Sequence, residues 1–137
     1  MPDITDVSDK ISKISGWLTD TVKKLDAAGV QKAVAMTAYD EAIALAEVKL
    51  RYLKGSKLFL LLKSLPAIEN QVLLSEVESG GSIPATLIPK IAAGLCGKQN
   101  LDCETATVAY KAILVKIEVL QAQLNACQSQ FRHLSHT

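Results

Sequence analysis

The chain contains 137 residues, of which 49% are hydrophobic and 21% charged, and its formal net charge is +1. This balance excludes an intrinsically disordered chain, and a net charge so close to zero excludes a surface that attracts nucleic acid or anionic lipid over its whole area. We expect a single domain spanning residues 1–137, because a chain of this length buries enough surface to form one core.

A first amphipathic helix is predicted from about Thr5 to Ala28. Its apolar residues alternate almost throughout between spacings of three and four positions, which places them in one stripe along a helix. The stripe consists of Ile4, Val7, Ile11, Ile14, Leu18, Val22 and Leu25. Asp3, Thr5 and Asp6 supply an acidic start that can cap the helix, and Gly29 can end it in a left-handed conformation.

A second helix is predicted from about Val30 to Lys54, with a stripe of similar spacing. This stripe consists of Met36, Tyr39, Ile43, Ala46, Leu50 and Leu53. Gly55 either ends the helix or only bends it, because a glycine inside a helix costs about 1 kcal/mol, which packing can offset.

Prolines mark the two elements that follow. Pro66 favours the first turn of a third helix, which is expected over Pro66–Ser79. Ser82 then offers a cap for a short segment over Ile83–Leu95, which contains two further prolines.

The last predicted helix is the most regular element of the sequence. Asp102 is a natural N-cap, and the apolar residues after it keep the three-four spacing that is typical of a heptad seam. The seam consists of Cys103, Ala106, Tyr110, Ile113, Ile117, Leu120, Leu124, Cys127, Phe131 and Leu134.

The same helix carries a second apolar stripe, which at about 100° per residue lies roughly opposite the seam. This valine–alanine stripe consists of Val108, Ala112, Val115, Val119, Ala122 and Ala126. A helix with two apolar sides must be covered on both, so the stripe faces either another helix of the chain or another chain. Its first four residues are therefore expected to form a protein interface, and the chain to form a homo-oligomer. Trp17, which flanks the first stripe, is either partly buried core or an anchor of that interface.

Together these elements predict an all-α fold. We expect an up-and-down helical bundle with coiled-coil-like packing, containing three long helices and one or two short ones. Aromatic residues make up only 4% of the chain, so the core is expected to consist of Leu, Ile, Val and Ala.

No cluster of residues predicts catalysis or a metal site. The candidate ligands are Cys96, Cys103, His133 and His136, with Cys127 as the third cysteine. Because a helix rises about 1.5 Å per residue, Cys103 and His133 lie roughly 45 Å apart on one continuous helix, and they could meet only across an antiparallel dimer. The cysteines are expected to behave as small hydrophobic residues and the histidines to lie in a solvated tail. We therefore expect no enzyme, no metal and no cofactor.

Basic residues without an intervening acid extend over residues 48–68. This basic segment consists of Lys49, Arg51, Lys54, Lys57 and Lys63. Tyr52 and Phe59 lie among them, and aromatic side chains between basic ones can stack with single-stranded bases. A solvated helix end, with lysine stems covering apolar surface, is the alternative interpretation. On a straight helix the charges spread widely around the axis, which favours that alternative.

Neither a secretory signal nor a membrane span is predicted. The first residues, MPDITD, lack a basic start followed by an apolar run. The longest apolar run, Leu58–Leu62, is far shorter than the ~20 residues that a membrane-spanning helix needs. We expect a cytoplasmic protein that does not bind membranes.

Two stretches have a familiar pattern, AYDEAIALAEVKLRY over Ala38–Tyr52 and LQAQLNACQSQFRHL over Leu120–Leu134. Together they cover about a quarter of the chain, and they resemble small helical proteins of bacteriophages and prophages. The resemblance implies an accessory role in phage DNA metabolism or in countering a host system, and it supplies no catalytic residue. Our leading hypothesis is a noncatalytic helical interaction protein, and the alternative is an accessory protein that binds single-stranded nucleic acid.

Overall fold

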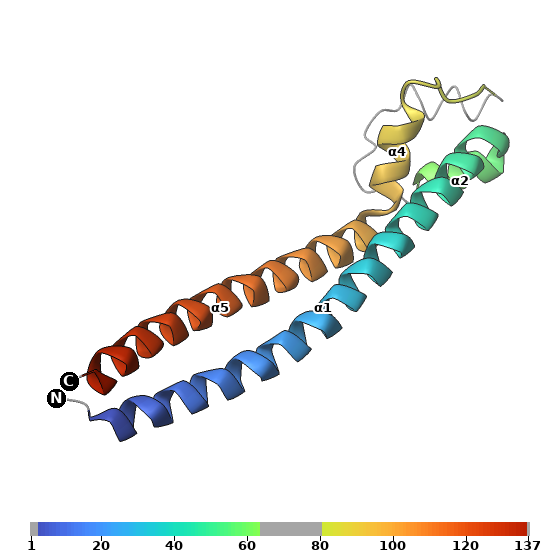
Figure 1. Ribbon diagram of the computed structural model, residues 1–137. Coiled ribbons are helices and arrows are strands. Elements are labelled where there is room, and N and C mark those ends of the chain that lie inside the picture. The colour runs from blue at the N-terminus through green and yellow to red at the C-terminus, as the bar shows by residue number, and fades with distance from the viewer. Residues whose placement is uncertain (1–2, 64–80, 137) are drawn as a thin grey trace. The chain divides into compact units, whose positions relative to one another are not determined.

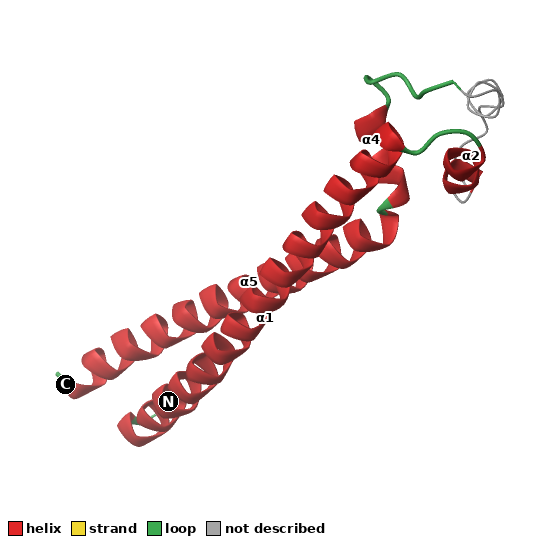
Figure 2. Ribbon diagram, turned by 90° about the vertical axis from the view of Figure 1, so that its right-hand side faces the viewer, coloured by secondary structure: helices red, strands yellow, loops and turns green. Residues whose placement is uncertain are grey.

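The computed structural model of the protein describes residues 3–63 and 81–136. These residues form four helices and no strand, as Figures 1 and 2 show. The helices are α1 (Ile4–Tyr52), α2 (Ser56–Lys63), α4 (Ile88–Leu95) and α5 (Gly97–Ser135). The predicted all-α helical bundle is confirmed. The helix predicted over Pro66–Ser79 lies outside the described residues.

Helix α1 passes through Gly29 without a break. The two helices predicted on either side of this glycine form one helix of 49 residues, so the predicted helix end at Gly29 is wrong. A Cβ atom built on Gly29 would lie 3.5 Å from Cε2 of Tyr110, which shows that the glycine packs beside the Tyr110 ring. Packing of this kind offsets the low helix propensity of glycine.

Burial along α1 follows one heptad seam across both predicted segments. Between residues 7 and 46 the buried and half-buried positions include Val7, Ile11, Ile14, Leu18, Thr21, Leu25, Ala28, Lys32, Ala35, Tyr39, Ala42 and Ala46. The apolar pattern placed Val22 and Met36 in the seam, but both are exposed. Thr21 and Ala35 lie in the seam instead. The hydroxyl of buried Thr21 donates to the Trp17 carbonyl oxygen at 2.7 Å, so it retains a hydrogen bond away from water.

The chain divides into two compact units, and α1 and α5 contribute to both. The first unit consists of Met1–Ala33 and Thr105–Thr137, and the second of Val34–Glu104. In the first unit α1 and α5 lie side by side and antiparallel (Figure 1). Gly29 packs beside Tyr110, whereas the earlier Ile14 and the later Gln123 line one depression, as an antiparallel pair requires. The expectation of one domain over residues 1–137 stays a prediction.

The seam of α5 is confirmed, because all ten of its residues are buried or half-buried. Its predicted N-cap is wrong, since α5 begins at Gly97 and not after Asp102. The Asn100 N–H already donates to the Cys96 carbonyl oxygen at 2.9 Å, so helical bonding starts before Asp102. At the start of α1 the predicted cap is present, as the Asp6 N–H donates to the Asp3 carboxylate at 2.9 Å.

The second unit contains a compact aliphatic core. Its buried members are Ala46, Leu50, Leu58, Leu62, Ile83, Ile88, Ile91, Ala92 and Cys96. The chain enters α2 through Gly55, whose φ of 64° is left-handed, so α1 ends before this glycine instead of bending through it.

Helix α4 starts later than predicted. The N–H of Leu87 donates to the Pro84 carbonyl oxygen at 2.9 Å in a turn, and the helix begins at Ile88 with Pro89 in its first turn. The segment expected from Ile83, with a cap at Ser82, is therefore wrong in its first five residues. Proline fixes its own φ and lacks an N–H, which suits a first turn and disfavours a helix interior.

The continuity of α1 leads to a test at Gly29. We expect Gly29→Ala to raise the free energy of unfolding by about 1 kcal/mol, because alanine has the higher helix propensity. The new Cβ would make only an ordinary van der Waals contact with Tyr110. Chemical denaturation measures the change.

The matched control is Gly55→Ala. It is expected to lower the free energy of unfolding by about 1–2 kcal/mol, because the left-handed φ at Gly55 is costly for an L-residue. A loss of stability at Gly29 as well would mean that the helix breaks there.

Candidate interaction surfaces

The valine–alanine stripe of α5 is open to solvent. All six of its residues are exposed, and the valine side chains Val108, Val115 and Val119 are 66%, 57% and 50% exposed. The opposite side of the same helix, its heptad seam, is buried or half-buried along its length. Helix α5 therefore has one apolar side that is covered and one that is not. The interface predicted at Val108, Ala112, Val115 and Val119 stays a prediction. The structure leaves these four side chains exposed, as such an interface requires.

The rim of the stripe is polar and carries little charge toward its C-terminal end. From Val108 to Ala126 the stripe extends about 27 Å at 1.5 Å per residue. Charged side chains flank its first half and its centre, namely Lys111, Lys116 and Glu118, and all three are exposed. The second half is flanked by uncharged exposed amides, namely Gln121, Gln123 and Asn125. No charge of one sign therefore dominates this side of α5.

Trp17 lies at the edge of the seam between α1 and α5. It is 54% exposed. It borders two depressions, of about 320 and 220 Å³. The larger one is lined by Trp17, Asp20, Thr21, Lys24, Lys116 and Leu120. The smaller one is lined by Lys10, Lys13, Ile14, Trp17 and Gln123.

Trp17 and the valine–alanine stripe belong to the same side of the first unit. Lys116 and Gln123 of α5 border the depressions beside Trp17. Val119 is three residues from Lys116 and four from Gln123, so all three residues share one face of α5. Across this side of the unit, Lys116 and Gln123 therefore lie between Trp17 and the valine–alanine stripe.

The basic segment lies in the second unit, and all five of its side chains are exposed. Lys49 and Arg51 occupy the last turn of α1, where cations stabilise the negative end of the helix dipole. Of the two aromatics among the basic residues, Tyr52 is 77% exposed, whereas Phe59 packs against the core. Only one aromatic ring is therefore open for stacking.

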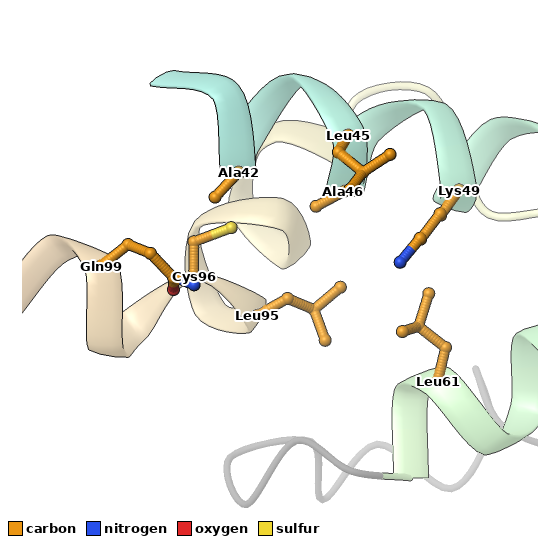
Figure 3. Close-up of a pocket in the computed structure, with 8 residues that line it drawn as sticks. All are labelled: Ala42, Leu45, Ala46, Lys49, Leu61, Leu95, Cys96 and Gln99. Carbon is orange, nitrogen blue, oxygen red and sulfur yellow. The ribbon is translucent and has the colours of Figure 1, made fainter. Parts of the chain in front are cut away.

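A pocket of about 280 Å³ opens in the second unit (Figure 3). It is lined by Ala42, Leu45, Ala46 and Lys49 of α1, Leu61 of α2, Leu95 of α4, Cys96, and Gln99 of α5. Two of these residues were candidates in the sequence, Lys49 as part of the basic segment and Cys96 as a possible metal ligand. The others had no signal in the sequence, because the pocket depends on the turn at Gly55 and on the late start of α4.

The pocket contains a thiol but no partner that would activate it. Cys96 is buried, and burial raises the pKa of its thiol above the ordinary value, so the thiol stays protonated at neutral pH. Neither a carboxylate nor an imidazole is among the lining residues. The arrangement offers an apolar wall and one ammonium group, and it contains no nucleophile with a base.

The candidate metal ligands are not brought together. Cys103 and Cys127 are half-buried on the seam of α5, and His133 and His136 are exposed near its end. Over residues 3–63 and 81–136, no three His, Cys, Asp or Glu residues are grouped so that they could hold a metal ion. None of the helices in these ranges is long and apolar enough to cross a membrane.

Comparison of the chain with models of protein families, with curated proteins and with solved structures found no match.

Proposed function

We propose that the protein is a noncatalytic helical interaction protein that acts through self-association and by binding a protein partner. The supporting observation is the exposed valine–alanine stripe on a helix whose other side is already covered. Covering these three valines and three alanines with another protein removes apolar surface from water, which stabilises the complex. The two depressions beside Trp17 lie next to the stripe and offer room for side chains of a partner.

The size of the stripe determines how strong the association can be. Its three valines are each about half exposed, so covering them contributes about 1 kcal/mol apiece, or about 6 kcal/mol for two copies. Association costs at least ~4 kcal/mol in lost freedom of motion. The three exposed alanines add about 0.5 kcal/mol apiece, which brings the gain for two copies to about 9 kcal/mol and leaves at most about 5 kcal/mol after the cost. We therefore propose a weak, reversible assembly with a dissociation constant on the order of 0.1 mM or weaker.

The cellular setting is part of the proposal. The resemblance of Ala38–Tyr52 and Leu120–Leu134 to phage and prophage proteins supports an accessory factor that works in the cytoplasm of an infected cell. In that role the protein binds and positions a partner and carries out no reaction of its own.

Light scattering over a concentration series tests the self-association. We expect the molar mass to rise from the 14.7 kDa of one chain toward twice that value between about 1 µM and 1 mM. Added salt should not weaken the assembly, because apolar burial is not screened by ions. A constant 14.7 kDa up to 1 mM would remove self-association from the proposed function.

A second candidate function is binding of single-stranded nucleic acid at the basic segment. The observation that favours it is the exposure of all five basic side chains together with the exposed ring of Tyr52. Basic groups attract the phosphates, and an open aromatic ring can stack with one base. Phe59 is half-buried against the core, so the second aromatic ring that the sequence offered is less open for stacking than Tyr52.

The double variant Lys54→Glu with Lys57→Glu tests this second function. If the basic segment binds single strands, a labelled oligonucleotide should bind at low salt, lose affinity as salt rises, and fail to bind the variant. Lys23→Glu with Lys24→Glu makes the same charge change at two exposed lysines of the first unit and should leave binding intact. Absence of binding by the unaltered protein at low salt would eliminate this function.

A further inference from the structure

We propose that the pocket of the second unit binds a small aliphatic monocarboxylate, with the carboxylate at Lys49 and the hydrocarbon tail against the apolar wall. This site goes beyond the interaction function proposed above, and it does not depend on the valine–alanine stripe or on self-association. It follows from the polarity, the charge and the volume of the pocket.

The floor of the pocket consists of apolar side chains that water barely reaches. Ala46 is 7% exposed and Cys96 is 4% exposed. Burial raises the pKa of the Cys96 thiol, which therefore stays neutral and adds no charge to the floor. Leu61 and Leu95 are half-buried and lie across the pocket from α1 (Figure 3). A hydrocarbon chain placed here leaves water for apolar surroundings, which stabilises its binding.

One ammonium group borders this apolar space. Among the described residues that line the pocket, Lys49 alone carries a charge. Figure 3 shows its side chain extending from α1 toward the space between Leu61 and Leu95. The residues three and four positions from it, which share its side of α1, are Leu45, Ala46, Tyr52 and Leu53, and none is acidic. A ligand carboxylate therefore meets an ammonium group that no acid of the pocket wall neutralises.

The same lining disfavours other classes of small molecule. Its second polar side chain is the amide of Gln99, which lies beside Cys96 and away from Lys49 (Figure 3). Two polar groups are too few for a sugar or a nucleobase, whose polar atoms would lose hydrogen bonds to water without replacing them. The described lining residues include neither an aromatic ring nor a carboxylate, so they offer nothing to a cationic ligand.

The volume of the pocket limits the length of the ligand. It is about 280 Å³, close to the lower end of the ~300–1,000 Å³ that small-molecule sites span. At about 30 Å³ for each group of the size of a water molecule, it holds about nine non-hydrogen atoms. Heptanoate has this size, whereas a long-chain fatty acid or a membrane lipid is much larger. The pocket therefore fits a free acid with a short to medium chain.

Methyl NMR of the full chain during titration with heptanoate tests the site. The methyl signals of Leu45, Leu61 and Leu95 should shift and saturate, with a dissociation constant on the order of 1 mM, as expected for so small a ligand. The methyl signals of Val108 and Val115 in the first unit should not move. Pocket signals that stay unchanged up to about 10 mM heptanoate would overturn the site.

The charge requirement is tested with Lys49→Glu at physiological salt. The new carboxylate repels that of the ligand, so heptanoate should bind about tenfold more weakly. The neutral analogue 1-heptanol has the same chain length and should bind the variant as it binds the unaltered protein. Lys57→Glu makes the same change at an exposed lysine outside the pocket lining, and it should alter the affinity for heptanoate by less than about twofold.

The location is tested by filling the pocket with Ala42→Leu. The larger side chain occupies part of the space, so heptanoate and 1-heptanol should both bind at least about tenfold more weakly. Ala44→Leu is the matched control, because Ala44 is an exposed residue of α1 that is not part of the lining. Helix content by circular dichroism shows whether both variants are folded. Lys49→Glu changes an exposed side chain, so the charge test decides the proposal even if Ala42→Leu does not fold.

The contrary outcomes each remove a stated part of the proposal. Heptanoate binding of unaltered strength in Lys49→Glu would overturn Lys49 as the partner of the carboxylate. The same result in folded Ala42→Leu would place the binding outside the pocket and overturn the site. Equal affinity of the unaltered protein for heptanoate and 1-heptanol would overturn the preference for an acid. None of these results bears on self-association, so the failure of this site is distinguishable from the failure of the proposed function.

Discussion

A single heptad seam between α1 and α5 determines the first unit, because two helices can cover only one side of each other. The seam of α5 is filled by aliphatic, aromatic and cysteine side chains, and that of α1 includes the polar Thr21, whose hydroxyl donates to the Trp17 carbonyl oxygen. Near the boundary with the second unit, the seam includes Gly29 beside the Tyr110 ring and Lys32 over it, with its Nζ atom 4.8 Å from the ring centroid. With only one partner helix in this unit, the opposite side of α5 stays open. The exposed valine–alanine stripe is a direct consequence of that constraint.

In the second unit, short helices cover the apolar side chains at the end of α1. The left-handed turn at Gly55 brings α2 against the end of α1, and Leu58 and Leu62 are then buried together with Ile88 and Ile91. Here the apolar sides of short helices cover the end of a long one. The basic side chains at this corner are left on the outside, and one of them, Lys49, borders the pocket of this unit.

Much of this arrangement could be predicted from the sequence, because apolar periodicity reports directly on burial. All ten α5 seam residues and the stripe opposite them were identified from spacing alone. The two wrong predictions in α1 have local causes. Gly29 lies within the helix, where Tyr110 packs beside it. Thr21 takes the seam position predicted for Val22, and its hydroxyl is satisfied there by a hydrogen bond to the backbone. The pocket beside Cys96 could not be predicted, since its walls come from four helices whose mutual packing leaves no periodic signal.

The central claim is that protein covers the valine–alanine stripe in the assembled state. Paramagnetic broadening of valine methyl signals by a soluble cosolute measures that cover directly, residue by residue. At high protein concentration the methyl groups of Val108, Val115 and Val119 should be protected, whereas those of Val30, equally exposed in one chain, should be broadened. Equal broadening of all four valines at every concentration would contradict the claim, because it would show that the stripe remains in water.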